Sequence, residues 1–239
     1  MKNIVIIGAS SGVGKALVEA YSASDYRVIA IARRIELIPC KSNIFPVAFD
    51  VTNHSDIKAL MTNIVKDYGK INTIAYCAGV QYIAPLRTSK VDKVIDVLNV
   101  NFVSAYFFLG SFSSKKIYAD ENPSFVVISS IAAQKPESGI LAYSASKAAI
   151  ESLVVGSAIE LAPIRVNAVA PGFMETQMTK DFPVVYSEEF IKELDKKTPL
   201  GMTLVSDVVK MIEFLSGESA TKITGEIIII NFAKSLGID

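Results

Sequence analysis

The sequence of 239 residues predicts a single α/β domain with a doubly wound, mainly parallel seven-stranded sheet and helices on both faces. Apolar runs of strand length alternate with helix-length stretches, which is the pattern of βαβ units. The composition, 51% hydrophobic and 20% charged, is that of a folded chain and excludes extensive disorder. No repeat or linker rich in Pro, Gly or Ser divides the sequence, so we expect one domain over residues 1–239.

Seven aliphatic runs have the length expected of buried parallel strands. They cover residues 4–7, 28–32, 45–49, 71–76, 125–129, 165–170 and 226–231. The apolar runs that contribute to the positive mean hydropathy of +0.39 are each far shorter than the ~18 residues of a membrane-spanning helix. No membrane association is therefore expected.

Helix-length stretches follow the strands. They cover residues 12–23, 55–67, 90–117, 141–161 and 204–215. The segment 173–202 breaks the alternation, because it is long, carries Pro183 and Pro199, and holds one short charged helix at 187–197. We interpret this segment as a substrate lid, with a surface excursion as the alternative.

Charge and cysteine content exclude several kinds of partner. Lys+Arg and Asp+Glu both number 24, and no basic stripe could neutralise a series of phosphates, so nucleic acid is not expected. Cys40 and Cys77 lack CxxC spacing and His54 is the single histidine, so no metal site is expected. The first strand begins too early for a signal peptide, and a cytoplasmic location is expected.

A glycine-rich turn follows the first strand and opens the first helix. In this context backbone amides approach a phosphate group at the helix N-terminus, and serine hydroxyls add further donors. We expect this turn to bind the phosphates of a dinucleotide, with an empty tight turn as the alternative. The expected contacts are Gly8, Ser10, Ser11, Gly12, Val13 and Gly14.

Two other motifs overlap this turn. A Walker A loop is excluded, because the glycine spacing differs and Lys15 is followed by Ala16 in place of Ser or Thr. The run from Gly8 to Gly12 matches the G-x-S-x-G nucleophile elbow, which makes Ser10 a candidate hydrolase nucleophile. The only histidine, His54, lies in a polar turn, so a serine hydrolase is the alternative enzyme class and not the main prediction.

The end of the second strand indicates which dinucleotide binds. An NAD site places a carboxylate there, whereas an arginine accommodates the 2′-phosphate of NADP. Arg33 and Arg34 occupy these positions, so NADP(H) is predicted, with two ordinary surface arginines as the alternative. Asp50 and Val51, after the third strand, are expected to flank the adenine.

A tyrosine and a lysine form the candidate catalytic pair. Tyr143 and Lys147 lie one turn apart on a predicted helix and therefore share a face. The ammonium is expected to lower the pKa of the phenol and make it a usable acid or base. Ser130 ends the fifth strand, at the sheet edge where such folds bind ligands, and is expected to orient the substrate oxygen.

Together these motifs resemble the short-chain dehydrogenases/reductases over nearly the whole chain, in the order and spacing of that family. The matching residues are Gly8-x3-Gly12-x-Gly14, Asp50-Val51, Ala78-Gly79, Asn101, Ser130, Tyr143-x3-Lys147 and Pro171-Gly172-x3-Thr176. The resemblance implies a Rossmann-type fold, a nicotinamide cofactor and a homodimer or homotetramer formed through the long helices.

The resemblance also implies a role for each catalytic position. Tyr143 would be the acid/base, Lys147 would tune it and hold the nicotinamide ribose, and Ser130 would stabilise the substrate oxygen. Asn101 would hold a water linking Lys147 to solvent; a polar residue that kinks a helix is the alternative for this position. The implied remaining cofactor contacts are Cys77, Ala78 and Gly79, and, around the nicotinamide carboxamide, Pro171, Gly172 and Thr176.

The sequence departs from the family pattern at three places. Ile7 replaces a threonine before the first glycine, and Tyr76-Cys77 replaces two asparagines that brace the sheet and the cofactor. Weaker cofactor binding is expected from these changes. The end of the chain, residues 231–233, lacks the usual glycine pair, which bears on packing between subunits.

The predicted activity is the NADP(H)-dependent reduction of a ketone, or the oxidation of the corresponding secondary alcohol. Apolar lid residues suggest a weakly polar substrate such as a 3-oxoacyl thioester; they are Phe173, Met174, Met178, Phe182, Val184, Val185 and Tyr186. The alternatives are an NAD(H)-dependent dehydrogenase of a sugar or other polar alcohol, and a dinucleotide sensor that performs no chemistry.

Overall fold

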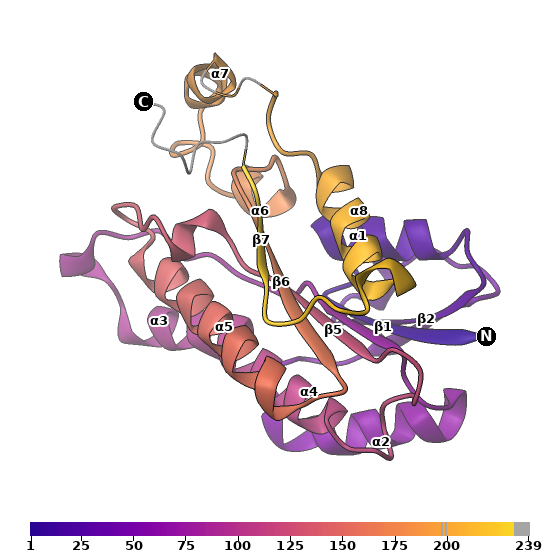
Figure 1. Cartoon of the computed structure of the whole chain (residues 1–239). Helices are drawn as coiled ribbons and strands as arrows, with labels where there is room; N and C mark the ends of the chain where they lie inside the picture. The colour runs from indigo at the N-terminus through magenta and orange to yellow at the C-terminus, as the bar shows by residue number, and fades with distance from the viewer. Residues whose placement is uncertain (197, 199, 232–239) are drawn as a thin grey trace.

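The sheet has seven strands, all parallel, in the order β3-β2-β1-β4-β5-β6-β7 (Figure 1). The computed structural model describes residues 1–196, 198 and 200–231. The strands are β1 Lys2–Ile7, β2 Tyr26–Ala32, β3 Ile44–Ala48, β4 Thr73–Tyr76, β5 Ser124–Ile128, β6 Arg165–Pro171 and β7 Ile227–Ile230. The predicted doubly wound α/β fold is confirmed.

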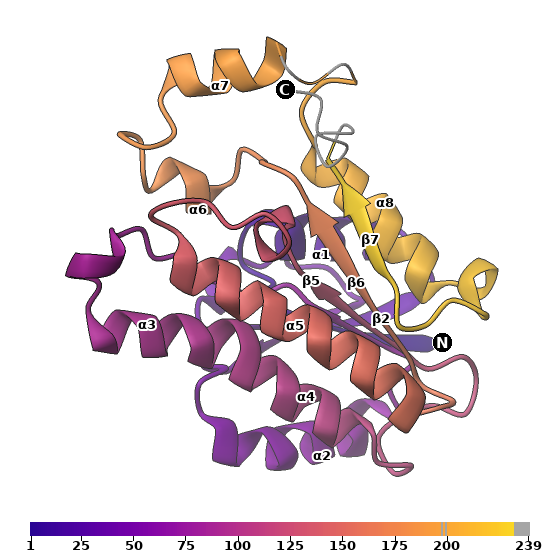
Figure 2. The same ribbon diagram turned by 60° about the vertical axis from the view of Figure 1, so that its left-hand side comes forward.

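Helices cover both faces of this sheet. They are α1 Gly12–Tyr21, α2 Ile57–Tyr68, α3 Val91–Leu98, α4 Ser104–Phe112, α5 Leu141–Glu160, α6 Gln177–Lys180, α7 Glu188–Lys196 and α8 Val205–Ser216. Helices α1 and α8 pack together on one face, and α2, α4 and α5 lie on the other (Figures 1 and 2). Helices α6 and α7 lie beyond the carboxyl ends of β6 and β7 (Figure 2).

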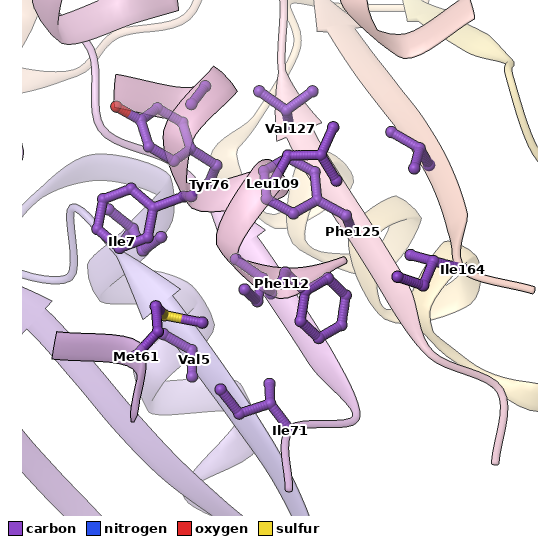
Figure 3. Close-up of a cluster of buried hydrophobic side chains, with 14 of the residues drawn as sticks. Val5, Ile7, Met61, Ile71, Tyr76, Leu109, Phe112, Phe125, Val127 and Ile164 are labelled. Atoms are coloured by element: carbon purple, nitrogen blue, oxygen red, sulfur yellow. The ribbon is translucent and has the colours of Figure 1, made fainter. Parts of the chain in front are cut away.

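Alternation along β1 builds two cores from one run of aliphatic residues. Successive strand side chains point to opposite faces. Ile4 and Ile6 therefore join the core beneath α1 and α8, while Val5 and Ile7 join the core beneath α2, α4 and α5 (Figure 3). All four are fully buried, which explains why this strand lacks the polar alternation of a half-exposed one.

The expectation of one continuous helix over residues 90–117 was wrong. A π-helical turn, Asn99–Val103, separates α3 from α4, and the helix ends at Phe112. The wider turn coincides with Asn101, whose fully buried amide forms hydrogen bonds outside its own helix. Single-turn π segments of this kind often occur at functional sites.

The stretch Val91–Phe112 is, by length and composition, apolar enough to cross a membrane. Its most apolar window has a mean hydropathy of 1.4 and is 33% buried, and it is the one such helix among the described residues. This finding differs from the expectation that apolar runs are of strand length only. The stretch packs against α2 and α5 within the fold.

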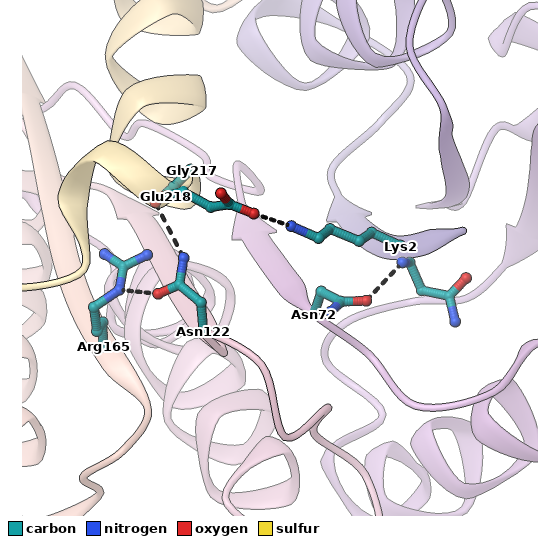
Figure 4. Close-up of polar contacts among 7 residues, drawn as sticks. Lys2, Asn72, Asn122, Arg165, Gly217 and Glu218 are labelled. Carbon is teal, nitrogen blue, oxygen red and sulfur yellow. Dashed lines mark hydrogen bonds and ion pairs between the residues drawn. The ribbon is translucent and has the colours of Figure 1, made fainter.

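Polar side chains tie together the edge of the sheet where the strands begin (Figure 4). Arg165, at the start of β6, donates from Nε to Asn122 at 2.8 Å, and the Asn122 amide donates to the Gly217 carbonyl at 3.1 Å. Lys2 pairs with Glu218 at 2.8 Å. With this edge closed by structural contacts, the carboxyl edge is the one left for a ligand.

Two parts of the sequence interpretation fall partly on residues outside the described ranges. Positions 197 and 199 belong to the predicted lid, and residues 232 and 233 belong to the altered C-terminal motif. The described part of the predicted lid contains α6 and α7, of which only α7 was expected.

Candidate active site

The glycine turn between β1 and α1 has two tightly packed glycines and one open one. A Cβ on Gly14 would lie 2.2 Å from the Gly8 carbonyl oxygen, and one on Gly8 would lie 2.6 Å from the Ala78 nitrogen. Gly12 has φ of +52°, and no atom lies within 4 Å of the point that a Cβ would occupy there, so space is open at the start of α1. Backbone amides facing open space at a helix N-terminus fit a phosphate group.

A cleft continues from this turn along the ends of β2, β3 and β4. Its lining includes Ser10, Ser11, Arg33, Arg34, Asp50, Val51, Ala78 and Gly79. Arg33 lies 3.8 Å from Asp50, and its side chain is 72% exposed, so the guanidinium is available to a ligand. Hydrogen bonds from Thr52, together with Arg33, lower the pKa of Asp50. The cleft thus brings together the residues predicted for the adenosine end of a dinucleotide.

The unusual Tyr76-Cys77 pair has its own contacts. The Tyr76 hydroxyl donates to the Val100 carbonyl at 2.5 Å, which ties β4 to the π turn. This bond provides bracing that the sequence interpretation assigned to the missing asparagines. Burial raises the pKa of the Cys77 thiol to about 12, so the thiol is neutral at physiological pH.

Ser130, Tyr143 and Lys147 converge at the carboxyl edge of the sheet. Ser130 follows β5, and its hydroxyl forms a hydrogen bond with Tyr143 from α5. The Lys147 ammonium donates to the Ile128 carbonyl at 2.8 Å and lies 5.6 Å from the centre of the Tyr143 ring. These residues line one cavity of about 210 Å³ together with Gly12, Pro171, Gly172 and Thr176.

The expectation that the pKa of Tyr143 is lowered was wrong. Burial raises the pKa of Tyr143 to about 12, and the hydrogen bond with Ser130 only partly opposes that effect. Burial lowers the pKa of Lys147 to about 8, because the ammonium loses its water shell. At neutral pH the site therefore holds a protonated phenol, which is the form that donates a proton.

Asn101 is fully buried and contacts the segment that follows β4. Its Oδ1 accepts from the Val80 nitrogen at 2.8 Å, and its Nδ2 donates to the Val80 carbonyl at 3.0 Å and to the Ser146 hydroxyl at 2.9 Å. Both amide protons are used, while Oδ1 keeps a second lone pair. The water contact that the family resemblance implies stays a prediction.

The segment predicted as a lid places an aromatic cluster in the wall of the cavity. The ring of Phe173 lies 5.2 Å from that of Tyr186 and 5.5 Å from that of Phe190, and the last two lie 5.7 Å apart. Two of the apolar residues expected to face the substrate face solvent instead, since Val184 is 92% and Val185 45% exposed. Phe182 lines the cleft along the ends of β2, β3 and β4 and not the cavity that Tyr143 lines.

A sequence profile of the family described as short chain dehydrogenase matches residues 2–184. The chain belongs to this family. The resemblance inferred from the motifs is thereby confirmed, and with it the assignment of this short-chain dehydrogenase as an oxidoreductase that uses a nicotinamide cofactor and acts on a small molecule.

Two curated relatives of this short-chain dehydrogenase align over almost the full length. One is the 3-oxoacyl-[acyl-carrier-protein] reductase of Thermotoga maritima, 31% identical over 95% of each chain. Another is the 5-keto-D-gluconate 5-reductase of Escherichia coli K12, 30% identical over 96% of this chain and 94% of that protein. Both names describe the reduction of a ketone, one in an acyl thioester and one in a sugar acid.

Solved structures show the same fold. The ligand-free aldohexose dehydrogenase of Thermoplasma acidophilum superposes with a TM-score of 0.89 at 27% identity, over 98% of this chain and 94% of that one. A 4-hydroxyisoleucine dehydrogenase was solved with NADH, at a TM-score of 0.84, 26% identity and 97% coverage of both chains. ElxO was solved with NADP bound. It superposes with a TM-score of 0.86 at 25% identity, over 98% of this chain and 99% of that one.

The sequence interpretation of this short-chain dehydrogenase missed several residues that line the cavity. They are Gln81, Glu137, Ile140, Phe190 and Leu194. These residues come from separate loops and from α7, so no local spacing relates them. Gln81 alone had a usable signal, because it follows Ala78-Gly79 at the carboxyl end of β4.

The serine hydrolase alternative lacks a histidine placed to act as its base. His54 Nε2 lies 3.1 Å from the Ser104 hydroxyl, and the imidazole stacks on Phe107 at 5.7 Å. Ser10 lines the cleft along the ends of β2, β3 and β4, and His54 is not among the residues that line this cleft. Within the described part of the chain, no histidine is thus placed beside Ser10, and the elbow motif does not form a serine hydrolase site.

Proposed function

We propose that this short-chain dehydrogenase reduces a ketone to a secondary alcohol with NADPH and catalyses the reverse oxidation with NADP⁺. The observation that carries the proposal is the convergence of Ser130, Tyr143 and Lys147 in the cavity that also reaches the open glycine turn. A dinucleotide in the cleft would present its nicotinamide to these side chains.

The residues of the chain divide the work of reduction. A bound reduced nicotinamide supplies the hydride that the carbonyl carbon takes up. The protonated Tyr143 donates to the carbonyl oxygen, so that one C–H and one O–H bond form as the C=O double bond becomes a single bond. Ser130 donates a hydrogen bond to the same oxygen, and the Lys147 ammonium stabilises the negative charge left on the phenolate.

The remaining residues would hold the cofactor. Gly8, Ser10, Ser11, Gly12, Val13 and Gly14 would contact its phosphates, Asp50 and Val51 the adenine, and Cys77, Ala78, Gly79, Pro171, Gly172 and Thr176 the nicotinamide end. Lys147 would also bind the nicotinamide ribose. Thr176 is the N-cap residue of α6, and its backbone nitrogen donates to the Thr179 hydroxyl at 3.0 Å, which orders this part of the wall.

We propose NADP(H) as the cofactor because of the residues that line the cleft. Arg33 and Arg34 lie where a 2′-phosphate would arrive, and the carboxylate of Asp50 is already compensated by Arg33. A guanidinium binds a phosphate through paired, charge-assisted hydrogen bonds. The NADP bound to ElxO and the NADH bound to the 4-hydroxyisoleucine dehydrogenase show that both cofactors occur on this fold.

A weakly polar ketone, such as a 3-oxoacyl thioester, is the substrate class that we propose. The rings of Phe173, Tyr186 and Phe190 pack together in the wall of the cavity that Tyr143 also lines, and we assign residues 173–202 as the lid that closes over the substrate. The name of the Thermotoga relative supports this class. The name of the Escherichia coli relative supports the alternative, a sugar-derived substrate.

We also propose that the enzyme assembles as a homodimer or homotetramer through helices α4 and α5. Large apolar side chains are exposed on these two helices: Tyr106 53%, Phe107 45%, Val155 49% and Ile159 86%. Such a surface costs free energy in water and is typical of a protein interface. An interface on this face would also account for an apolar helix that is only partly buried.

Nucleotide titration followed by a substrate panel tests the proposal. We expect NADPH to bind more tightly than NADH, and Arg33→Ala to weaken NADPH about tenfold or more while NADH binding changes little, since a hydrogen bond to a charged group contributes about 1.5–3 kcal/mol. Arg87→Ala, outside the cleft lining, is the control. Turnover of sugars but not of acyl or aromatic ketones would refute the substrate class.

A further inference from the structure

The substrate cavity has a polar end that the reaction as described does not use. Gln81, from the segment after β4, donates from Nε2 to the hydroxyl oxygen of Tyr186 in the lid at 2.7 Å. Both side chains line the same cavity as Tyr143. Because the amide occupies a lone pair of the phenol oxygen, the O–H of Tyr186 is free to donate to a ligand.

The position of this second phenol is fixed from two sides. The rings of Phe173 and Phe190 pack against Tyr186 at 5.2 and 5.7 Å, and Gln81 holds its hydroxyl. Tyr186 is also near enough to Tyr143 for the two phenols to interact electrostatically. A substrate bound at Tyr143 therefore shares its cavity with a second phenol that can donate a hydrogen bond.

The charge around Tyr186 restricts what this donor can bind. Glu137 lines the cavity. Burial is the largest cause that raises the pKa of Tyr186, and the charge of the Glu137 carboxylate raises it further. The phenol therefore stays protonated and acts as a donor at physiological pH. The same carboxylate repels an anionic group, so the favoured ligand atom is an uncharged acceptor oxygen.

We propose that Tyr186, positioned by Gln81, binds a second, uncharged carbonyl oxygen of the substrate, a few bonds from the ketone that is reduced. This specificity would favour 3-oxoacyl esters and thioesters over plain ketones and over the anions of 3-oxo acids. The inference rests on the proposed ketone reduction and makes its substrate class more specific.

A matched pair of ketones tests the proposal. Ethyl acetoacetate and 2-heptanone have chains of the same length, and only the first carries the second carbonyl. Since the ester also activates the ketone, the readout is the change between variants in the ratio of kcat/KM for the two substrates with NADPH. We expect Tyr186→Phe to lower this ratio about tenfold, the effect of one hydrogen bond between neutral groups.

Control variants separate this role from a general effect on the lid. Gln81→Leu is expected to lower the same ratio, because it releases the Tyr186 hydroxyl. Glu137→Gln is expected to raise kcat/KM for the acetoacetate anion relative to the ethyl ester. Tyr26→Phe, at the start of β2 and outside the cavity lining, should leave the ratio unchanged.

An unchanged ratio in both Tyr186→Phe and Gln81→Leu would overturn the proposal. Should the wild-type enzyme reduce neither ketone, the proposed function fails, and the subsite is then judged by binding. Quenching of bound NADPH fluorescence would give the affinities of the enzyme–NADPH complex for the two ketones. A preference for the ester that disappears in Tyr186→Phe supports the subsite, and a preference that persists contradicts it.

Discussion

At the scale of single residues, the site combines a neutral acid with a lysine whose charge is only weakly maintained. The phenol of Tyr143 and the ammonium of Lys147 are both shifted by the same cause, the loss of water around a buried polar group. Burial favours the uncharged form of each, so it raises the pKa of the acid and lowers that of the amine. Proton donation then depends on the ammonium that stabilises the phenolate product.

This arrangement predicts how reduction depends on pH. Lys147 is protonated below its pKa of about 8 and neutral above it, against an ordinary value of 10.5. We expect kcat/KM for ketone reduction to be level below pH 8 and to fall by about tenfold per pH unit above it, as for loss of one ionised group. A profile that stays level to pH 10, with the fold intact by circular dichroism, would contradict this role for Lys147.

At the scale of elements, two glycines of the first βα unit have different roles. Gly14 allows close packing, and Gly12 is proposed to allow cofactor binding. Gly14 is required because α1 crosses the backbone of the turn too closely for any side chain. Gly12 is required for its left-handed backbone and for the open space beside it. The same short motif thus stabilises the unit at one position and, in the proposed function, would bind a phosphate at another.

A pair of substitutions tests this separation. Gly14→Ala would place a Cβ 2.2 Å from a carbonyl oxygen, and we expect it to lower the free energy of unfolding by about 3 kcal/mol. Gly12→Ala should cost only about 1 kcal/mol of backbone strain but weaken NADPH binding strongly. Urea unfolding and NADPH titration of both variants give the comparison. If Gly14→Ala and Gly12→Ala were equally stable and lost the same affinity for NADPH, the two glycines would not have separate roles.

The elements also show how far the sequence could predict the structure. The run from Ile4 to Ile7 predicted a buried strand because its two faces are equally apolar. The interruption at Asn99–Val103 was not predictable from helical periodicity, since the side chain that accompanies it, Asn101, bonds to Val80 from a different part of the chain. Cavity residues such as Glu137 escaped prediction for the same reason, because their proximity arises only from the tertiary fold.

At the scale of the whole molecule, the proposed active site lies at one edge of the sheet. The amino edge is tied by contacts such as that between Arg165 and Asn122, while the carboxyl edge holds the glycine turn, Tyr143 and the proposed lid. The motifs of the sequence predicted that the candidate catalytic residues lie at this edge, as expected for an open parallel sheet, and the structure brings them together there. The pKa of Tyr143 was not predictable from its spacing to Lys147, because burial outweighs their proximity.

The exposed apolar side chains of α4 and α5 predict that the protein forms a homo-oligomer. We expect light scattering to give a mass of two or four times 25.8 kDa for the wild-type enzyme. A double variant, Val155→Asp with Ile159→Asp, places charges on the exposed face of α5 and should shift the mass toward one chain, because an unpaired charge is costly in a buried interface. A wild-type mass of 25.8 kDa would contradict the proposed interface.

The central claim, that Tyr143 donates the proton beside the nicotinamide, is tested most directly by removing its hydroxyl alone. In Tyr143→Phe we expect kcat for reduction of ethyl acetoacetate with NADPH to fall about 1,000-fold, within the range for loss of a general acid, while the dissociation constant of NADPH changes less than about threefold. Reduction by Tyr143→Phe at the wild-type rate would contradict the account.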